Sequence, residues 1–314
     1  MPSFYFLELF TDPFVFSVPV NWDTFDGLAH CRGRAGGRSF FVVMPIYWDA
    51  FASREENARI WAKTRLLYPE ATMLWLVPQH RDVELLASMG IDALQCHQNA
   101  FLDETIFRPD RLATKRYNAA FNANSAAFKR HELAWGVERL ALITYCLAGE
   151  TTERLEGYRD LAFSNFDRGT RATTSLSAAE VASVLNQARC GLMLSQLEGA
   201  NYASAEYMFC GIPLVTTPSS GGRHALYDSR QVLVVSPTPA AVEAGVAQCV
   251  DWPIDPEELH TLALAKAIPH RRRLLDWLSR VIESDAHALA NANAWLPSFR
   301  DKLRVFHLVL PRDR

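Results

Sequence analysis

Short apolar runs alternate along this chain with segments of helical periodicity, and this alternation restricts the fold more than any other feature. The first series begins with RSFFVVMP (38–45), a predicted buried strand, followed by a predicted helix at 54–68. Further strand, helix and strand signals follow at 72–78, 81–90 and 91–97. Strands that alternate with helices are typical of a parallel sheet covered by helices. The sequence therefore predicts an α/β fold.

A second α/β series follows a linker at 99–115 that contains proline and mixed charge. Its predicted strands cover residues 116–123, 141–148, 190–195, 213–217 and 231–236. Its predicted helices cover residues 129–140, 151–163, 175–188, 201–211, 238–250 and much of 255–285. The stretch PSFRDKLRVFHLVL (297–310) closes the sequence.

These two series predict two Rossmann-like α/β lobes that face each other across a cleft. We expect an N-terminal lobe at 1–110, a C-terminal lobe at 111–285 and a segment at 286–314 that packs back on the N-terminal lobe. Ligands of such folds bind at the carboxyl ends of parallel strands, so the sites should lie there.

Composition narrows the class of protein. The 314 residues are 49% hydrophobic with a net charge of −3, which does not indicate a basic nucleic-acid-binding protein. No apolar run reaches the roughly 20 residues of a membrane span. The N-terminal stretch lacks a basic start and predicts a strand and turn, not a signal peptide. The six cysteines have no C-x-x-C spacing, so we expect reduced thiols in a cytoplasmic protein.

Several familiar site motifs are missing. No G-x-G-x-x-G follows a strand, and no Walker A or G-x-S-x-G motif is present. The nine histidines show no metal-ligand spacing, so we expect no metal site. The Gly- and Arg-rich stretch CRGRAGGRS (31–39) precedes a strand and predicts a mobile loop.

The stretch EGANYASAEYMFCGIPLV carries Glu198 at a predicted strand-to-helix junction and Glu206 inside the helix. The N-terminus of a helix suits an anion such as a phosphate. Glu198 stands beside this position and could accept hydrogen bonds from hydroxyl groups. Glu206 has apolar neighbours, so it should be partly buried and need a partner, for which vicinal ribose hydroxyls are suitable. An exposed surface position is the alternative for each glutamate.

Two other features point to the same edge of the sheet. Lys129 and Arg130 stand near the predicted start of a helix, where cations oppose the dipole. Such a pair could neutralise a diphosphate, although an ordinary solvated pair is the alternative. The turn PSSGG (218–222) adds backbone N–H groups after the next strand.

Together these residues resemble the C-terminal domain of retaining GT-B glycosyltransferases of glycosyltransferase family 4. That family carries a Glu, seven residues, a second Glu and then Gly-x-Pro, as in Glu198, Glu206 and GIP (211–213). Its diphosphate-binding lysine, its Gly-Gly turn and its interlobe Phe-x-Pro segment are similar to Lys129, SSGG and NAFLDETIFRP. The resemblance covers about residues 99–250.

The resemblance implies a GT-B-like enzyme with a shortened N-terminal lobe. Such an enzyme would move a hexosyl group from a nucleotide-diphosphate-sugar to a glycan or glycolipid, with retention and without a metal or other cofactor. Glu198 would bind the donor sugar, Lys129 would neutralise the leaving diphosphate, and Glu206 would accept the ribose hydroxyls. The other implied donor contacts are Arg130, Gly199, Ala200, Asn201, Asn124, Ser220, Gly221 and Gly222. Polysaccharide assembly in the cytoplasm is the expected setting, with contact to the inner membrane face as an open alternative.

The chain also departs from that family. An arginine usually precedes the lysine by a few residues, and here Asn122 and Asn124 stand in that region. The N-terminal lobe lacks the family's Gly-rich loop, and its candidate acceptor-side residues are Tyr47, Trp48, Asp49 and His97. Two other functions therefore stay open: a GT-B-like protein that binds a nucleotide-sugar or a partner without transfer, and a GT-B enzyme of another class, such as an epimerase.

Overall fold

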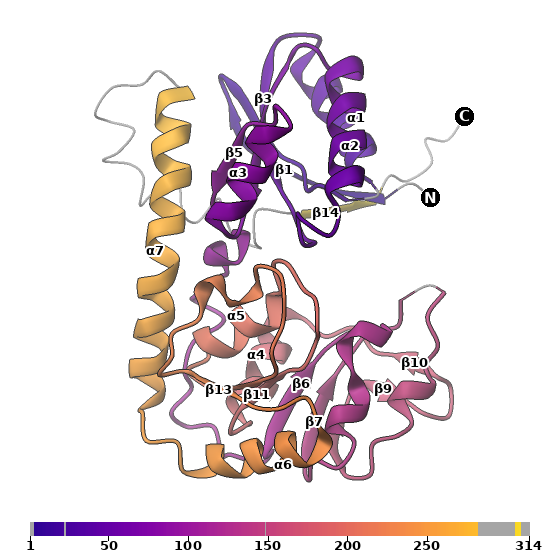
Figure 1. Cartoon of the computed structure of the whole chain (residues 1–314), viewed down its shortest axis with the longest axis vertical. Helices are drawn as coiled ribbons and strands as arrows, with labels where there is room; N and C mark the ends of the chain where they lie inside the picture. Colours follow the sequence, from indigo (N-terminus) through magenta and orange to yellow (C-terminus); the bar gives the residue numbers. More distant parts are fainter. Residues whose placement is uncertain (1–2, 22, 148, 282–304, 309–314) are drawn as a thin grey trace. The chain divides into compact units, whose positions relative to one another are not determined.

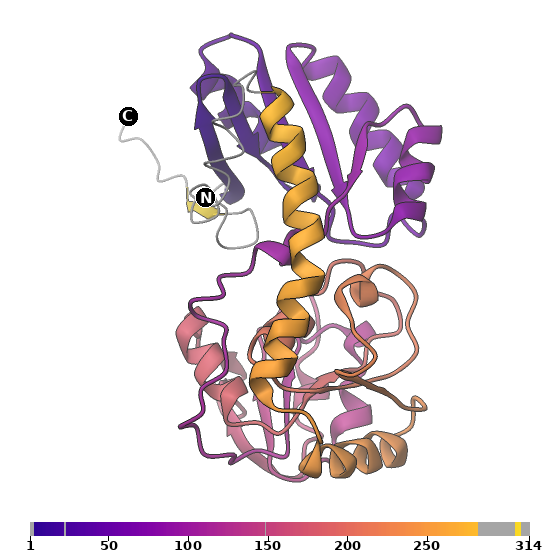
Figure 2. The same ribbon diagram turned by 90° about the vertical axis from the view of Figure 1, so that its left-hand side faces the viewer.

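A computed structural model describes residues 3–21, 23–147, 149–281 and 305–308 (Figure 1). The chain forms two compact units. The first comprises the described residues of Met1–Asp103, Gly221–Ala225 and Ala267–Arg314, and the second comprises those of Glu104–Ser220 and Leu226–Lys266. The division falls within α7 (Pro256–Val281), which Figure 2 shows as one continuous helix. The domain limits expected from the sequence stay predictions.

The first unit is built on a six-stranded sheet with the order β14-β1-β2-β3-β4-β5. Strands β2 to β5 are parallel, whereas β1 pairs antiparallel with both β2 and β14. The elements are β1 (Ser3–Thr11), β2 (Phe14–Ser17), α1 (Thr24–Ala35), β3 (Phe40–Pro45), α2 (Arg54–Leu67), β4 (Ala71–Val77), α3 (His80–Ser88), β5 (Ala93–Gln95), the 3-10 helix η1 (Gln98–Phe101) and β14 (Val305–Leu308).

Both faces of this sheet are covered. Leu28, Ile60 and Leu86, from α1, α2 and α3, join one core with alternate residues of the strands, including Trp75. On the other face Trp277 of α7 meets Phe41 of β3 edge-on, with ring centroids 6.4 Å apart. Burial on two faces explains why β3 is a continuous apolar run in the sequence.

The second unit has a parallel sheet with the order β13-β12-β11-β6-β7-β8. Its strands are β6 (Ala119–Asn122), β7 (Leu140–Ile143), β8 (Leu161–Ser164), β11 (Gly191–Met193), β12 (Leu214–Thr216) and β13 (Val232–Val234), with a small antiparallel pair, β9 (Phe166–Asp167) and β10 (Ala172–Thr173). Its helices are α4 (Ala178–Asn186), α5 (Tyr202–Phe209), α6 (Pro239–Gln248) and the start of α7, with 3-10 turns η2 (Ala127–Lys129), η3 (His131–Ala134), η4 (Glu153–Leu155), η5 (Arg223–Leu226) and η6 (Cys249–Asp251).

Close packing fixes α5 against this sheet. A Cβ atom on Gly191 of β11 would lie 2.3 Å from the ring of the buried Tyr207. Since that distance is far below van der Waals contact, only glycine lets α5 approach so closely. The small residues Ala203, Ser204 and Ala205 of α5 are buried as well.

Three predicted local structures are wrong. The predicted loop at 31–39 is helical as far as Ala35, where α1 ends, and the next residue, Gly36, takes the left-handed conformation (φ 61°) that commonly follows a helix. The predicted helix at 129–140 is two 3-10 turns, because Arg130 between them has a positive φ of 54°. The predicted helix at 151–163 is one 3-10 turn followed by β8, which pairs with β7.

The predicted C-terminal segment, 286–314, lies outside the described residues except for Val305–Leu308. This strand, β14, pairs antiparallel with β1 in the first unit. All six cysteines carry free thiols.

Candidate functional site

Most of the predicted donor residues lie at the carboxyl edge of the second unit's sheet. β6 ends at Asn122 next to β11, and the loop after β11 carries Ser195 and Glu198. α5 begins directly after this loop, with Asn201 as its N-cap accepting the backbone N–H of Ser204 at 2.9 Å. A polar loop therefore joins the sheet edge to the N-terminus of a helix, where an anion is favoured.

Lys129 and Glu198, the two residues predicted to be catalytic, form an ion pair with each other. Their side chains are only 10% and 11% exposed. The hydroxyl of Ser195 donates to the second carboxylate oxygen. Burial raises the pKa of Glu198, but the charge of Lys129 and hydrogen bonds from Lys129, Ser195 and Asn201 outweigh it, so the pKa lies below its ordinary value. The carboxylate is therefore ionised at neutral pH.

Glu206 is buried on α5, and its partner comes from the end of β6. The side-chain amide of Asn122 donates to Glu206 Oε2 at 2.8 Å. The backbone N–H of Asn122 donates to the hydroxyl of Tyr207 at 2.6 Å. Two successive residues of α5 thus hold the carboxyl end of β6. The sequence predicted that Glu206 is partly buried, which agrees with its burial in the structure. The hydrogen bond from Asn122 was not predicted, and the role of Glu206 toward a ribose stays a prediction.

Arg130 points its guanidinium into the protein. Its Nε donates to the carbonyl oxygen of Leu194 at 2.5 Å, and its Nη2 donates to the hydroxyl of Thr217, also at 2.5 Å. These bonds tie the loop that carries Lys129 to the carboxyl ends of β11 and β12. The positive φ of Arg130 is a strained conformation for a residue with a Cβ, and such strain is often found at functional sites. Its role as a diphosphate ligand stays a prediction.

Asn124 closes the same loop from the other side. The side-chain oxygen of Asn124 accepts a hydrogen bond from the backbone N–H of Ala126 at 3.1 Å. The backbone carbonyl oxygen of Asn124 accepts a hydrogen bond from Nε2 of His131 at 2.7 Å. Nδ1 of His131 lies 2.6 Å from the hydroxyl of Tyr158. Burial lowers the pKa of His131 to about 4, so the ring is neutral at pH 7 and both nitrogens are used in holding the loop.

The predicted glycine-rich turn is divided between the two units. Ser220 belongs to the second unit, where its carbonyl accepts the N–H of Glu198 at 3.1 Å. Gly199 and Ala200 are buried in the loop next to Glu198. Gly221 and Gly222 group with the first unit. Ser220 is therefore hydrogen-bonded to the loop of Glu198, and the roles predicted for Gly221 and Gly222 stay predictions.

The candidate acceptor-side residues lie at the carboxyl edge of the first unit's sheet. Trp48 and Asp49 follow β3, where Trp48 Nε1 donates to Asn57 Oδ1 at 2.9 Å and Asp49 lies 3.6 Å from Arg81. Tyr47 precedes them in the same loop. His97 follows β5, two strands away, and is 1% exposed. Burial, with the nearby His270, lowers the pKa of His97 to about 3, so this ring is neutral.

A buried carboxylate at this edge was not predicted from the sequence. Asp82, in the first turn of α3, is 2% exposed and lies 3.8 Å from Arg81. Burial raises its pKa to about 6, more than Arg81 offsets, and the charge of Asp49 adds to the rise. Its burial depends on packing of α3, which the sequence did not reveal. Ser195 was also missed, although its place at the end of a predicted strand was a usable signal.

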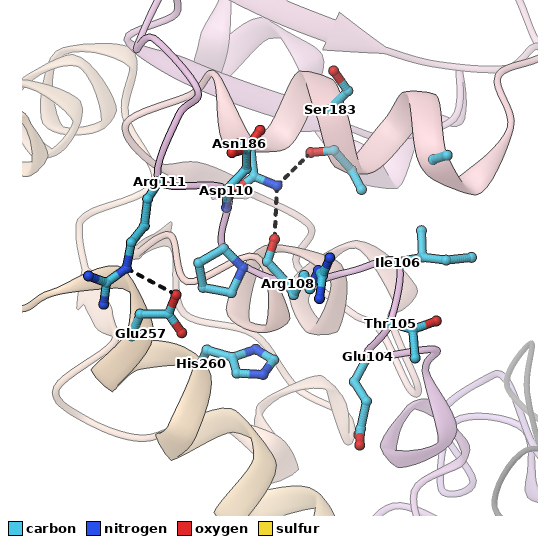
Figure 3. Close-up of a pocket in the computed structure, with 13 residues that line it drawn as sticks. Glu104, Thr105, Ile106, Arg108, Asp110, Arg111, Ser183, Asn186, Glu257 and His260 are labelled. Carbon is cyan, nitrogen blue, oxygen red and sulfur yellow. Dashed lines mark hydrogen bonds and ion pairs between the residues drawn. The ribbon is translucent and has the colours of Figure 1, made fainter.

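A separate cavity of about 710 Å³ lies within the second unit, between the segment before β6, α4 and the start of α7 (Figure 3). Arg111 pairs with Glu257 across it at 3.3 Å, and the amide of Asn186 donates to the carbonyl of Arg108 at 3.0 Å. None of the predicted site residues lines this cavity. Its lining comprises Glu104, Thr105, Ile106, Arg108, Pro109, Asp110, Arg111, Ala179, Ala182, Ser183, Asn186, Glu257 and His260.

The described part of the chain has neither a cluster of metal ligands nor a membrane-spanning helix. No group of three or more His, Cys, Asp or Glu side chains in these ranges could hold a metal ion. No described helix is both long and apolar enough to pass through a membrane.

Part of this chain matches a family of known proteins. Residues 129–251 match the family model described as glycosyl transferases group 1, which is less than half of the chain. A search of curated proteins gave no match.

Solved structures are similar to most of the chain. HepE from Anabaena in complex with UDP-glucose has 12% identity and a TM-score of 0.52, over 82% of this chain and 74% of that one. Sucrose-phosphate synthase from Thermosynechococcus elongatus has 12% identity and a TM-score of 0.53, over 88% and 77%. A glycosyltransferase from Rickettsia africae has 9% identity and a TM-score of 0.50, over 87% and 77%.

The class is therefore that of proteins with the GT-B glycosyltransferase fold, as predicted, with two Rossmann-like α/β units. The matched segment contains both Lys129 and Glu198 as well as Glu206. Family match and fold together support a role in glycosyl transfer.

Proposed function

We propose that this protein transfers a hexosyl group from a nucleotide-diphosphate-sugar to a glycan or glycolipid acceptor, with retention and without a metal. The observation that carries the proposal is the joint placement of Lys129, Glu198 and Glu206 at one sheet edge, inside the segment that matches the glycosyltransferase model. Each of these groups suits a different part of such a donor.

Lys129 supplies the charge for the diphosphate. Its ammonium group is nearly buried, so its attraction for an anion is screened less than it would be in water. The charge that develops on the leaving diphosphate would be stabilised there, and preorganised stabilisation of this kind often lowers the barrier more than any other effect in an active site. In a retaining reaction of this kind, a departing phosphate oxygen takes the acceptor proton on the same face, so no protein nucleophile is needed.

The two glutamates would hold the two ends of the donor. Glu198 is ionised and next to the N-terminus of α5, so it suits the hydroxyl groups of the sugar. Glu206 lies in the second turn of α5, where its carboxylate suits the ribose. The similar HepE structure contains UDP-glucose, which makes UDP-sugars the first donors to test.

A thermal-shift screen with UDP-, GDP-, ADP- and CMP-sugars tests the donor site. At least one should stabilise the wild type, and Glu206→Ala should weaken its binding about 10- to 100-fold, as expected for losing hydrogen bonds to a charged group. Glu243→Ala, which removes an exposed carboxylate of α6, is the matched control and should bind like the wild type. The donor site would be contradicted if no nucleotide-sugar raised the melting temperature of the wild type, or if Glu206→Ala bound the nucleotide-sugar as tightly as the wild type does.

Turnover then separates the enzyme from its main alternative. With a donor that binds, sugar release or transfer should persist in excess EDTA, and the product should keep the anomeric configuration of the donor. Loss of activity with EDTA would contradict metal independence, and an inverted product would contradict retention.

One observation favours a second function, nucleotide-sugar binding without transfer. Asn122 and Asn124 stand in the region where the family that this chain resembles usually has an arginine, and the guanidinium of Arg130 is hydrogen-bonded to Leu194 and Thr217. Lys129 would then carry the leaving-group charge without a second cation. A clear thermal shift without turnover, over a broad panel of glycan and lipid acceptors, would favour this function.

A further inference from the structure

The Lys129–Glu198 ion pair joins two groups that the proposed reaction uses separately. Lys129 is needed by the diphosphate and Glu198 by the sugar, yet each is the other's partner. Both side chains are about nine-tenths buried, so bulk water cannot solvate either charge when the ion pair is broken. A donor must therefore replace both halves of the pair.

We infer that Glu198 is a specificity-determining residue that makes the site favour an intact nucleotide-sugar over the nucleoside diphosphate product. This inference rests on the proposed function. It compares how well the nucleotide-sugar and the nucleoside diphosphate compensate the two charges when the Lys129–Glu198 ion pair is broken.

An intact donor replaces both partners. Its phosphates take the place of the carboxylate beside Lys129, and its sugar hydroxyls donate to the carboxylate that Lys129 has left. Ser195 and Asn201 stay hydrogen-bonded to Glu198 and keep it in position. Since both charges keep close partners, the exchange has a small net cost.

A nucleoside diphosphate replaces only one partner. It offers phosphate oxygens to Lys129, but it brings no hydroxyl group to Glu198. The carboxylate then stays nearly buried and ionised next to an added negative phosphate, and like charges placed together oppose binding. The product should therefore leave more readily than the donor, which would limit product inhibition.

The test compares inorganic pyrophosphate, UDP and UDP-glucose by isothermal titration calorimetry, with another base if the thermal-shift screen selects one. Glu198→Gln removes the competing charge but keeps the size of the side chain. It should bind pyrophosphate and UDP about tenfold more tightly than the wild type, because breaking a close charge pair opposes binding by at least this factor. The preference for UDP-glucose over UDP should fall by a similar factor.

Two controls show whether Lys129 transmits the effect. The double variant Lys129→Met with Glu198→Gln should lose the gain in pyrophosphate and UDP binding, because the cation is gone. Glu243→Gln, which removes an exposed charge from α6, should bind like the wild type.

The outcomes separate this inference from the proposed function. If nucleotide-sugars bind the wild type but Glu198→Gln gains no affinity for pyrophosphate or UDP, the inference is overturned and the donor site stands. If no nucleotide-sugar binds, the proposed function fails, whereas the pyrophosphate titration still measures the competition for Lys129. A gain that survives in the double variant also overturns the inference.

Discussion

Replacing Lys129 with methionine should destabilise the second unit by about 3 kcal/mol at pH 7. Removing one partner of a buried ion pair typically costs about 3–5 kcal/mol, because the other charge is left without compensation. We expect the lower end of this range. Glu198 is still 11% exposed, and Ser195 and Asn201 remain hydrogen-bonded to it.

This loss should depend on pH in a defined direction. In the wild type the pKa of Glu198 is lowered, so its stabilising contribution is full above the unfolded value of about 4.3 and is lost as the pH falls through the folded pKa. In Lys129→Met the lysine no longer offsets the effect of burial on Glu198, so the pKa of Glu198 should rise. The folded variant then takes up a proton before the unfolded chain does. The stability difference from the wild type should therefore narrow between pH 7 and pH 5.

Urea unfolding followed by hydrogen exchange of α5 peptides measures this difference in the second unit alone, since two units need not unfold in one step. The double variant Lys129→Met with Glu198→Gln is the control and should recover most of the loss, because no charge is left buried. A variant as stable as the wild type, or a loss of equal size at pH 7 and pH 5, would refute the reasoning.

Two further substitutions test the backbone that shapes the site. In urea unfolding, Arg130→Gly should be more stable than Arg130→Ala by about 1 kcal/mol. Both variants lose the hydrogen bonds of the guanidinium, but only glycine adopts φ 54° without strain. Equal stabilities of the two variants would show that the strain at this position is negligible. Gly211→Ala should lower the free energy of unfolding by more than about 2 kcal/mol, because its φ is 68° and its Cβ would lie 2.2 Å from the carbonyl oxygen of Pro256. Gly33→Ala at an exposed position of α1, where nothing lies within 4 Å, is the matched control and should stabilise the protein by up to about 1 kcal/mol. A small effect of Gly211→Ala would contradict the clash.

Local signals predicted the regular elements well. The helices predicted at 175–188 and 238–250 are present as α4 and α6. A capping box of Ser177 and Glu180 begins α4, and Thr238 caps α6 with Pro239 in its first turn. Hydrogen bonds between neighbours in sequence, and the fixed φ of proline, make such features readable from a few residues. The Glu-x7-Glu stretch likewise lies at the strand-to-helix junction where the sequence placed it.

Local signals failed where distant partners decide the backbone. Residues 129–140 have helical periodicity, but Arg130 takes a positive φ and reaches Leu194 and Thr217, which are 64 and 87 positions away. Residues 151–163 look helical too, but Leu161–Ser164 becomes an edge strand because β7 offers its free edge. In both cases contacts across the fold outweigh local propensity, which is worth only tenths of a kcal/mol per residue.

The sequence by itself determined the α/β alternation, the position of the carboxyl strand ends and the types of group at the site, because these depend on periodicity and on neighbours along the chain. Only the tertiary structure decided that β11 lies beside β6, and that Lys129 and Glu198, 69 positions apart, are paired. Strand order and the pairing of buried charges depend on which surfaces exclude water together, and no short stretch of sequence contains that information. The site was therefore foreseen as a set of residues, whereas the ion pair at its centre emerged from the fold.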